Sequence, residues 1–178
     1  DCSKWVENTI GRTPECGLDS ARLELAELQN TSLQIYVTRD FNRIRTYTER
    51  LDTEHPDWKY GLLISNFPES NVLTRQQGWE LGFGRNNNTV STTQYGQWYS
   101  GGCRKLEKAC SVYGNQGLEL DCPIVIFGGD YIRQNGNWVS QGYWFNRQRN
   151  DYEDPETIVE NNYRVLLTRA RRSMILFI

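Results

Sequence analysis

Short apolar runs rich in β-branched residues alternate along this chain with amphipathic segments of helical period. The apolar runs predict five strands, near residues 33–38, 60–65, 106–112, 123–128 and 174–178. Apolar residues on one face predict helices over residues 41–55 and from 155 onwards. Two more helices are predicted, one over residues 4–10 before Gly11 and one from 19 or 20 to 29, which is rich in the good helix formers alanine and leucine. Strand, helix and strand in succession form the unit of a parallel sheet. The pattern therefore predicts one α/β domain with a mostly parallel sheet, helices on both faces and long loop insertions.

Local signals mark the starts of three helices and one turn. Ser3, Asp40 and Asp154 each precede a predicted helix, where a short polar side chain can cap the first free N–H groups. The proline after Asp154 fits the first helical position. Asn135-Gly136 lies between strand-forming flanks and predicts a hairpin with a type I′ turn over residues 131–140.

Between residues 66 and 102 the hydrophobic periodicity disappears, which predicts a long irregular insert. The aromatic residues of the insert include Trp79, Phe83, Tyr95, Trp98 and Tyr99. Aromatic rings could stack on the bases of a single strand. They also bury large areas while keeping a polar end in water, so we expect most of them to anchor the loop to the domain.

The charges of the 178 residues are nearly balanced, with 20 basic and 22 acidic side chains and a net charge of −2. This balance argues against a surface that is basic overall, so any basic surface for nucleic acid must be local. The candidates are Arg133, Arg147, Arg149, Arg164, Arg169, Arg171 and Arg172. No apolar run approaches the roughly 18 residues of a membrane span, and we expect a cytoplasmic protein with no membrane partner.

The five cysteines, at positions 2, 16, 103, 110 and 122, have no Cys-x-x-Cys spacing, and only one histidine could complete a metal site. We therefore expect no metal site. Free thiols in a reducing cytosol are the simpler interpretation, although the sequence alone leaves a disulfide open.

The most informative stretch is residues 113–130, which predicts a loop, a buried strand and a second loop. Gly114 and Gly117 can adopt backbone conformations that other residues rarely adopt. This freedom allows the polar side chains at 116, 119 and 121 to gather at one edge of the loop beside the predicted strand. Ligands of parallel sheets bind beside strand ends, so this polar cluster is a candidate binding site.

Two segments carry a family resemblance. Gln-Gly-Leu-Glu-Leu-Asp at residues 116–121 resembles motif V of superfamily 1 helicases, and residues 163–171, Tyr-Arg-Val-Leu-Leu-Thr-Arg-Ala-Arg, resemble their motif VI. With residues 35–40 and 60–65, they are similar to an uncharacterised helicase-like family, domain of unknown function 2075, related to the helicase part of Schlafen proteins. The resemblance implies a RecA-like P-loop NTPase fold. Residues 1–178 would then be a single C-terminal helicase domain of a longer protein.

An ATP site in such motors lies between two RecA-like domains. This sequence contains no Gly-x-x-x-x-Gly-Lys-Thr/Ser loop and no apolar run leading to Asp-Glu, so both Walker motifs are absent. We therefore expect ATP and Mg²⁺ to bind only together with an N-terminal RecA-like domain of the same polypeptide. The isolated chain should not hydrolyse ATP.

By resemblance to motif VI, Arg169 would be the arginine finger that reaches the γ-phosphate of ATP. Its planar, permanently charged guanidinium suits phosphate oxygens. The simpler alternative is an arginine that stabilises the C-terminal end of a helix. By resemblance to motif V, Gly117 and Glu119 would face the nucleotide, with Glu119 bonding the ribose and Gln116 nearby. The alternative for Glu119 and Asp121 is a solvated loop or a helix cap.

Residues that could contact single-stranded DNA or RNA are Thr38, Arg39, Arg171 and Arg172. The alternative for Thr38 and Arg39 is that they contact no ligand and that their segment is structural, with Asp40 capping the helix that follows. The chain also departs from its relatives, because Ser111-Val112-Tyr113 stands where they usually read Thr-Glu-Phe. A carboxylate is thereby lost, and the upstream arginine of motif IV would precede Asp1.

The resemblance favours the C-terminal half of a superfamily 1 helicase-like ATPase that completes an ATP site and contacts nucleic acid. The alternative is a catalytically inactive module that binds nucleic acid or protein on the same fold. A phosphate-binding loop upstream of Asp1 would favour the motor. A self-contained hydrolase or nuclease ranks last, because the single His55 offers no clustered catalytic arrangement.

Overall fold

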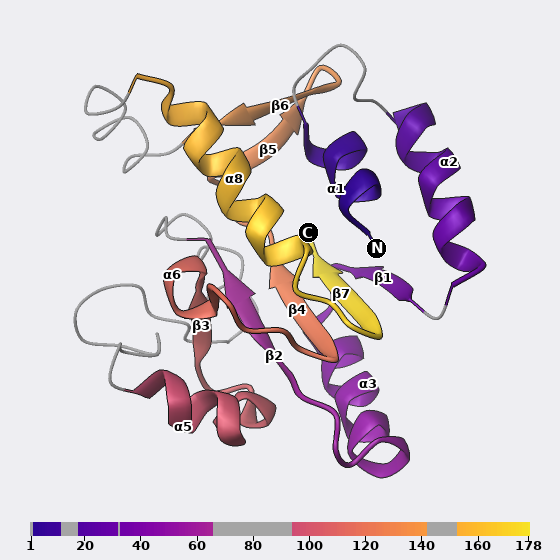
Figure 1. Ribbon diagram of the computed structural model, residues 1–178, viewed down its shortest axis with the longest axis vertical. Coiled ribbons are helices and arrows are strands. Elements are labelled where there is room, and N and C mark those ends of the chain that lie inside the picture. The colour runs from indigo at the N-terminus through magenta and orange to yellow at the C-terminus, as the bar shows by residue number, and fades with distance from the viewer. Residues whose placement is uncertain (1, 12–17, 32, 66–93, 142–152) are drawn as a thin grey trace.

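The computed structural model of the protein describes residues 2–11, 18–31, 33–65, 94–141 and 153–178 (Figure 1). In these ranges no helix is both long enough and apolar enough to cross a bilayer. Residues 66–93 of the predicted insert, which include Trp79 and Phe83, lie outside the described residues. Arg147 and Arg149 also lie outside them.

A five-stranded sheet in the order β1-β7-β4-β2-β3 forms the centre of the domain. Its strands are β1 (Gln34–Thr38), β2 (Tyr60–Ile64), β3 (Ala109–Ser111), β4 (Cys122–Ile126) and β7 (Ser173–Phe177). Every neighbouring pair is parallel. The predicted α/β class with a parallel sheet is confirmed, and the strand bounds agree to within two residues for all but β3.

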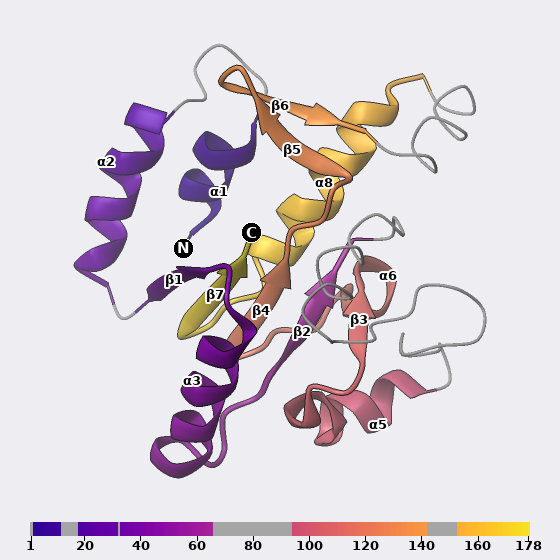
Figure 2. The ribbon, with the colours of Figure 1, turned by 180° about the vertical axis from the view of Figure 1, so that it is seen from behind.

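Helices cover both faces of this sheet. The helices are α1 (Ser3–Ile10), α2 (Leu18–Gln29), α3 (Phe41–Glu54), α5 (Tyr95–Ser100), α6 (Val112–Asn115) and α8 (Pro155–Leu167). Leu62 and Ile64 of β2 belong to the apolar cluster that α3 covers, whereas Leu63 between them belongs to the cluster under α1 and α8. Figure 1 shows α8 across one face, and Figure 2, from behind, shows α3 on the other. Alternate residues of the buried strands thus build two cores.

Two of the three predicted helix caps are confirmed. Asp40 accepts a hydrogen bond from the N–H of Asn42 at 2.9 Å, and Asp154 accepts one from the N–H of Thr157 at 3.1 Å. The prediction for Ser3 was wrong, because Cys2 occupies the N-cap position and Ser3 is already helical.

The predicted hairpin is confirmed. Strands β5 (Tyr131–Gln134) and β6 (Asn137–Ser140) pair antiparallel. The turn residues Asn135 and Gly136 have φ angles of 51° and 85°, as a type I′ turn requires. The Trp138 indole donates to the Thr9 carbonyl at 2.6 Å, which ties the hairpin to the end of α1.

The predicted strand at 106–112 was wrong at both ends. Leu106 has a φ of 54° and ends a short 3-10 helix, η3 (Gly102–Lys105), and Val112 already begins α6. A left-handed residue cannot continue a strand, so β3 keeps only three residues.

The end of the predicted irregular insert was also wrong, since Tyr95–Ser100 forms α5. Trp98 on this helix is buried, and its indole donates to the Lys108 carbonyl at 3.1 Å. The expectation that aromatic residues anchor this segment is therefore met at Trp98.

Candidate functional site

The segments that resemble motifs V and VI lie side by side. Residues 116–121 lead into β4 and residues 168–172 lead into β7, and these strands are neighbours in the sheet. The Leu120 N–H donates to the Arg169 carbonyl at 3.0 Å, and the Arg171 N–H donates back to the Leu120 carbonyl at 2.9 Å. Main-chain hydrogen bonds therefore hold the two segments in a fixed register.

Asp121 extends this connection to a third strand. Its carbonyl accepts hydrogen bonds from the N–H groups of Arg172 and Ser173, and its carboxylate accepts one from the Lys59 N–H at 2.8 Å. Lys59 directly precedes β2. Asp121 thus joins the starts of three strands, rather than being only a solvated loop residue or a helix cap.

Glu119 and Arg171 form an ion pair across the two segments, with 2.6 Å between Arg171 Nε and Glu119 Oε2. The carboxylate raises the pKa of Arg171, so the guanidinium stays charged. Both side chains are about half exposed, at 57% for Arg171 and 50% for Glu119. Each can therefore reach a ligand from solvent if the pair opens.

Gln116 and Gly117 are exposed at the start of the same segment. Gly117 has a φ of 80°, a conformation that other residues rarely adopt, and a Cβ there would meet no heavy atom within 4 Å. Backbone geometry, and not lack of space, thus requires glycine at this position.

Arg169 lies at the C-terminal end of α8. Its Nε donates to the Val165 carbonyl at 3.0 Å, which is the contact expected of an arginine that stabilises a helix end. The side chain is partly exposed. The arginine-finger role stays a prediction.

Residues 1–178, the whole chain, match the family model for the Schlafen group 3, DNA/RNA helicase domain. The chain belongs to this family. The predicted relation to the helicase part of Schlafen proteins is thereby confirmed. No curated protein matches the sequence.

The Schlafen helicase domain does not bring the four predicted nucleic-acid-binding residues together. Thr38 and Arg39 lie at the carboxyl end of β1, whereas Arg171 and Arg172 precede the amino end of β7. The pairing of Gln34 with Ser173 and of Thr38 with Phe177 separates the two groups by about 20 Å along the strands. Asp40, next to Arg39, caps α3, as its structural alternative predicted.

Two residues of the Schlafen domain that touch the site were not singled out from the sequence. The Tyr99 hydroxyl donates to the Glu119 carbonyl at 2.9 Å, and the Lys59 ammonium lies 3.8 Å from the centre of the Tyr99 ring. The only sequence signal for Tyr99 is its place among the aromatic residues of the insert.

A buried polar cluster lies at the carboxyl ends of β2 and β4. The Tyr163 hydroxyl donates to Asp130 Oδ1 at 2.7 Å and accepts from the Gly128 N–H at 3.1 Å, and the Ser65 hydroxyl donates to the other Asp130 oxygen. Burial and the neighbouring carboxylate raise the pKa of Tyr163, so its hydroxyl stays a donor. The cluster joins the end of β2 and the segment after β4 to α8.

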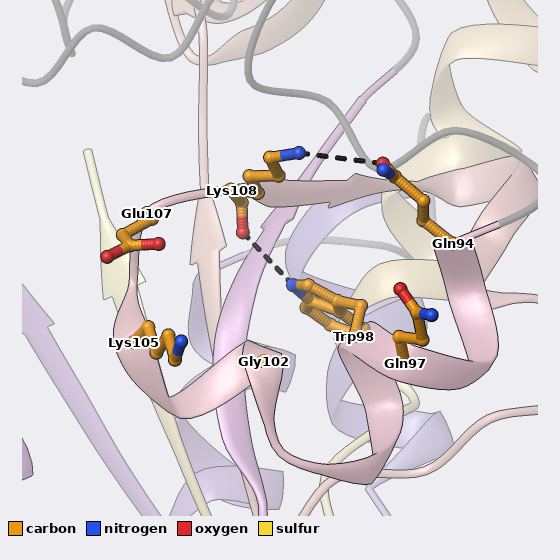
Figure 3. Close-up of a pocket in the computed structure, with 7 residues that line it drawn as sticks. All are labelled: Gln94, Gln97, Trp98, Gly102, Lys105, Glu107 and Lys108. Atoms are coloured by element: carbon orange, nitrogen blue, oxygen red, sulfur yellow. Dashed lines mark hydrogen bonds between the residues drawn. The ribbon is translucent and has the colours of Figure 1, made fainter.

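A cavity of about 350 Å³ opens between α5, η3 and the segment before β3 (Figure 3). Its lining residues are Gln94, Gln97, Trp98, Gly102, Lys105, Glu107 and Lys108. The cavity contains none of the predicted site residues. Among the described residues, no three His, Cys, Asp or Glu side chains lie close enough to hold a metal ion, and Cys2, Cys103, Cys110 and Cys122 are buried free thiols.

Proposed function

We propose that this domain completes an ATP site in a helicase-like motor, together with an N-terminal RecA-like domain of the same polypeptide. The observation that supports the proposal is the main-chain pairing between Leu120 and the residues 169–171. This pairing places Gly117, Glu119 and Arg169 on two adjacent segments, so one nucleotide could contact both. The other domain would supply the phosphate-binding loop and the Mg²⁺ ligands.

In this proposal each segment has a separate task. Arg169 stabilises the charge that develops on the γ-phosphate, a role worth ~10³ to 10⁵ in rate in related phosphoryl-transfer enzymes. Glu119 accepts a hydrogen bond from the ribose, and Gln116 lies beside it. ATP with Mg²⁺ supplies the reactive phosphoryl group.

We further propose that single-stranded DNA or RNA contacts the exposed Arg171 and Arg172. Their guanidinium groups are suited to backbone phosphates. A second contact at Thr38 and Arg39 would have to bind a different part of the strand, because of the distance along β1 and β7. This contact would extend the footprint over several nucleotides.

One observation favours the alternative of an inactive binding module. Val112 occupies the position where the relatives usually have glutamate, and it is 2% exposed in the apolar core. The carboxylate is therefore replaced by a core residue. If that carboxylate is essential for coupling, the domain would bind nucleic acid or protein without driving hydrolysis.

The test is the ATP hydrolysis rate of the native polypeptide that carries this domain, with and without single-stranded nucleic acid. We expect Arg169→Ala to lower the stimulated rate at least a hundredfold, which corresponds to the loss of about 3 kcal/mol or more from one preorganised donor. Nucleotide binding of both proteins is measured first.

Arg22→Ala serves as the control, because Arg22 is an exposed arginine of α2 that pairs with Asp19. It should leave the rate unchanged. Nucleotide binding without hydrolysis in the wild-type protein would contradict the motor and leave the binding module.

A further inference from the structure

Tyr99 connects α5 to the segment that carries Glu119. Its hydroxyl donates to the Glu119 carbonyl at 2.9 Å across 20 residues of sequence. The neighbouring Leu118 and Leu120 donate their own N–H groups to Asn115 and Arg169. The hydroxyl of Tyr99 therefore holds the Glu119 carbonyl, which lies between two residues whose N–H groups are already hydrogen-bonded.

The Tyr99 ring is itself held in place. The Lys59 ammonium lies 3.8 Å from its centre, a distance at which the cation is attracted to the ring face. Lys59 is fixed in turn, since its N–H donates to the Asp121 carboxylate and its carbonyl accepts from the Cys122 N–H at 3.0 Å. Lys59, which holds one face of the ring, is thus fixed at the starts of β2 and β4, where the candidate site also lies.

The helix that carries Tyr99, α5, packs closely on the sheet. Trp98 is 4% exposed and its ring packs against Gly61 of β2, where a Cβ would come within 2.8 Å of Trp98 Cζ2. The absent side chain at Gly61 therefore lets α5 approach the strand closely. A residue on such a helix can position a neighbouring loop with little motion of its own.

Glu119 is the part of the site that most needs positioning. Its side chain is half exposed, and the segment begins at Gly117, whose backbone is intrinsically free. Arg171 holds the carboxylate from one side, and Tyr99 holds the carbonyl of the same residue from the other. If the hydroxyl is removed, the Glu119 carbonyl loses this partner, and the peptide that directs the carboxylate is held less firmly.

We propose that Tyr99 is a positioning residue for nucleotide binding, acting through Glu119 without touching the nucleotide. This inference rests on the proposed function, because it requires Glu119 to contact ATP. It goes further by assigning a role to α5, the helix that follows residues 66–93. That helix aligns the nucleotide-facing segment of the domain.

The test is Tyr99→Phe in the native polypeptide, which keeps the ring over Lys59 and removes only the hydroxyl. We expect the KM for ATP to rise about three- to tenfold while kcat changes less than twofold, as for loss of one hydrogen bond that orients a binding group. Equilibrium titration with a fluorescent ADP analogue should show the same weakening.

Tyr60→Phe is the matched control. It also removes a tyrosine hydroxyl bond, the one from Tyr60 to Asp52 Oδ1 at 2.7 Å, but on the α3 face of the sheet. Tyr60→Phe should change stability and leave the KM for ATP unaltered. If Tyr99 has only a structural role, Tyr99→Phe should give this same result.

The outcomes separate the two proposals. If the wild type binds nucleotide and Tyr99→Phe has the same KM and the same affinity, the positioning role is wrong and the proposed function stands. If the wild type binds no nucleotide at all, both are wrong.

Discussion

The Arg171 guanidinium and the Glu119 carboxylate approach to 2.6 Å across the segments that precede β7 and β4. The two residues were expected to bind different ligands, since Glu119 was predicted to face the nucleotide and Arg171 nucleic acid. Each is the present partner of the other. A phosphate group that binds at Arg171 Nε therefore competes with Glu119, and a ribose that binds at Glu119 Oε2 competes with Arg171.

We expect Arg171→Ala to weaken single-stranded nucleic-acid binding several-fold in the native polypeptide and to reduce the salt slope by about one, as for one lost phosphate contact. The melting temperature should change little, because exposed ion pairs contribute little to stability. Fluorescence anisotropy over a series of salt concentrations measures both quantities. An unchanged salt slope, with Arg22→Ala as reference, would remove Arg171 from the interface.

We expect Gly61→Ala to lower the free energy of unfolding by about 1–3 kcal/mol, because its Cβ would overpack Trp98 and Cys103. The added carbon would lie 2.8 Å from Trp98 Cζ2 and 2.9 Å from Cys103 Cβ. Gly96→Ala is the control, since a Cβ there meets nothing within 4 Å and alanine favours the helix. Chemical denaturation followed by tryptophan fluorescence distinguishes them, and equal stability of both variants would contradict the close packing of α5 on β2.

We expect Tyr163→Phe to lower the free energy of unfolding by about 1–3 kcal/mol, since it removes the hydroxyl that donates to the buried Asp130 carboxylate and accepts from the Gly128 N–H. Both hydrogen bonds are buried. Tyr36→Phe is the reference, because Tyr36 is 40% exposed. Thermal unfolding of the two variants side by side is sufficient, and an equally small shift in both would show that the cluster does not support the sheet.

Stability should fall at alkaline pH because of buried thiols. Burial raises the pKa of Cys110 and of Cys122 from 9.0 to about 12. The folded state therefore keeps these protons when the unfolded state has lost them. Their contribution is fully present below pH 9 and is lost as pH rises from 9 towards about 12, at about 1.4 kcal/mol per pH unit for each thiol.

Denaturation at several pH values between 8 and 11 measures this slope. Cys110→Ala should be less stable at every pH because it leaves a cavity, but its stability should fall less steeply with pH than that of the wild type. Identical slopes in the two proteins would mean that the Cys110 thiol ionises equally well in the folded state.

The features that could be predicted from sequence depend on neighbouring residues. Asp40 and Asp154 cap helices because their side chains reach N–H groups within three residues, and Asn135-Gly136 makes a type I′ turn because both positions need positive φ. The prediction failed at Ser3, where another residue occupies the cap. It also failed at Leu106, where a left-handed conformation interrupts an apparent strand.

By itself, the sequence determined the α/β class, the hairpin and the order of the five sheet strands and the four predicted helices along the chain, because each follows from local patterns. The two motif-like segments were found by their resemblance to a family. Only the tertiary structure decided which segments meet. The sheet order β1-β7-β4-β2-β3 puts β4 beside β7, which brings Glu119 to Arg171 and leaves Arg39 at the far end. The docking of α5 on Gly61 brings Tyr99 to the Glu119 carbonyl. Strand order and helix docking are set by burial of the whole core, so no local pattern records them.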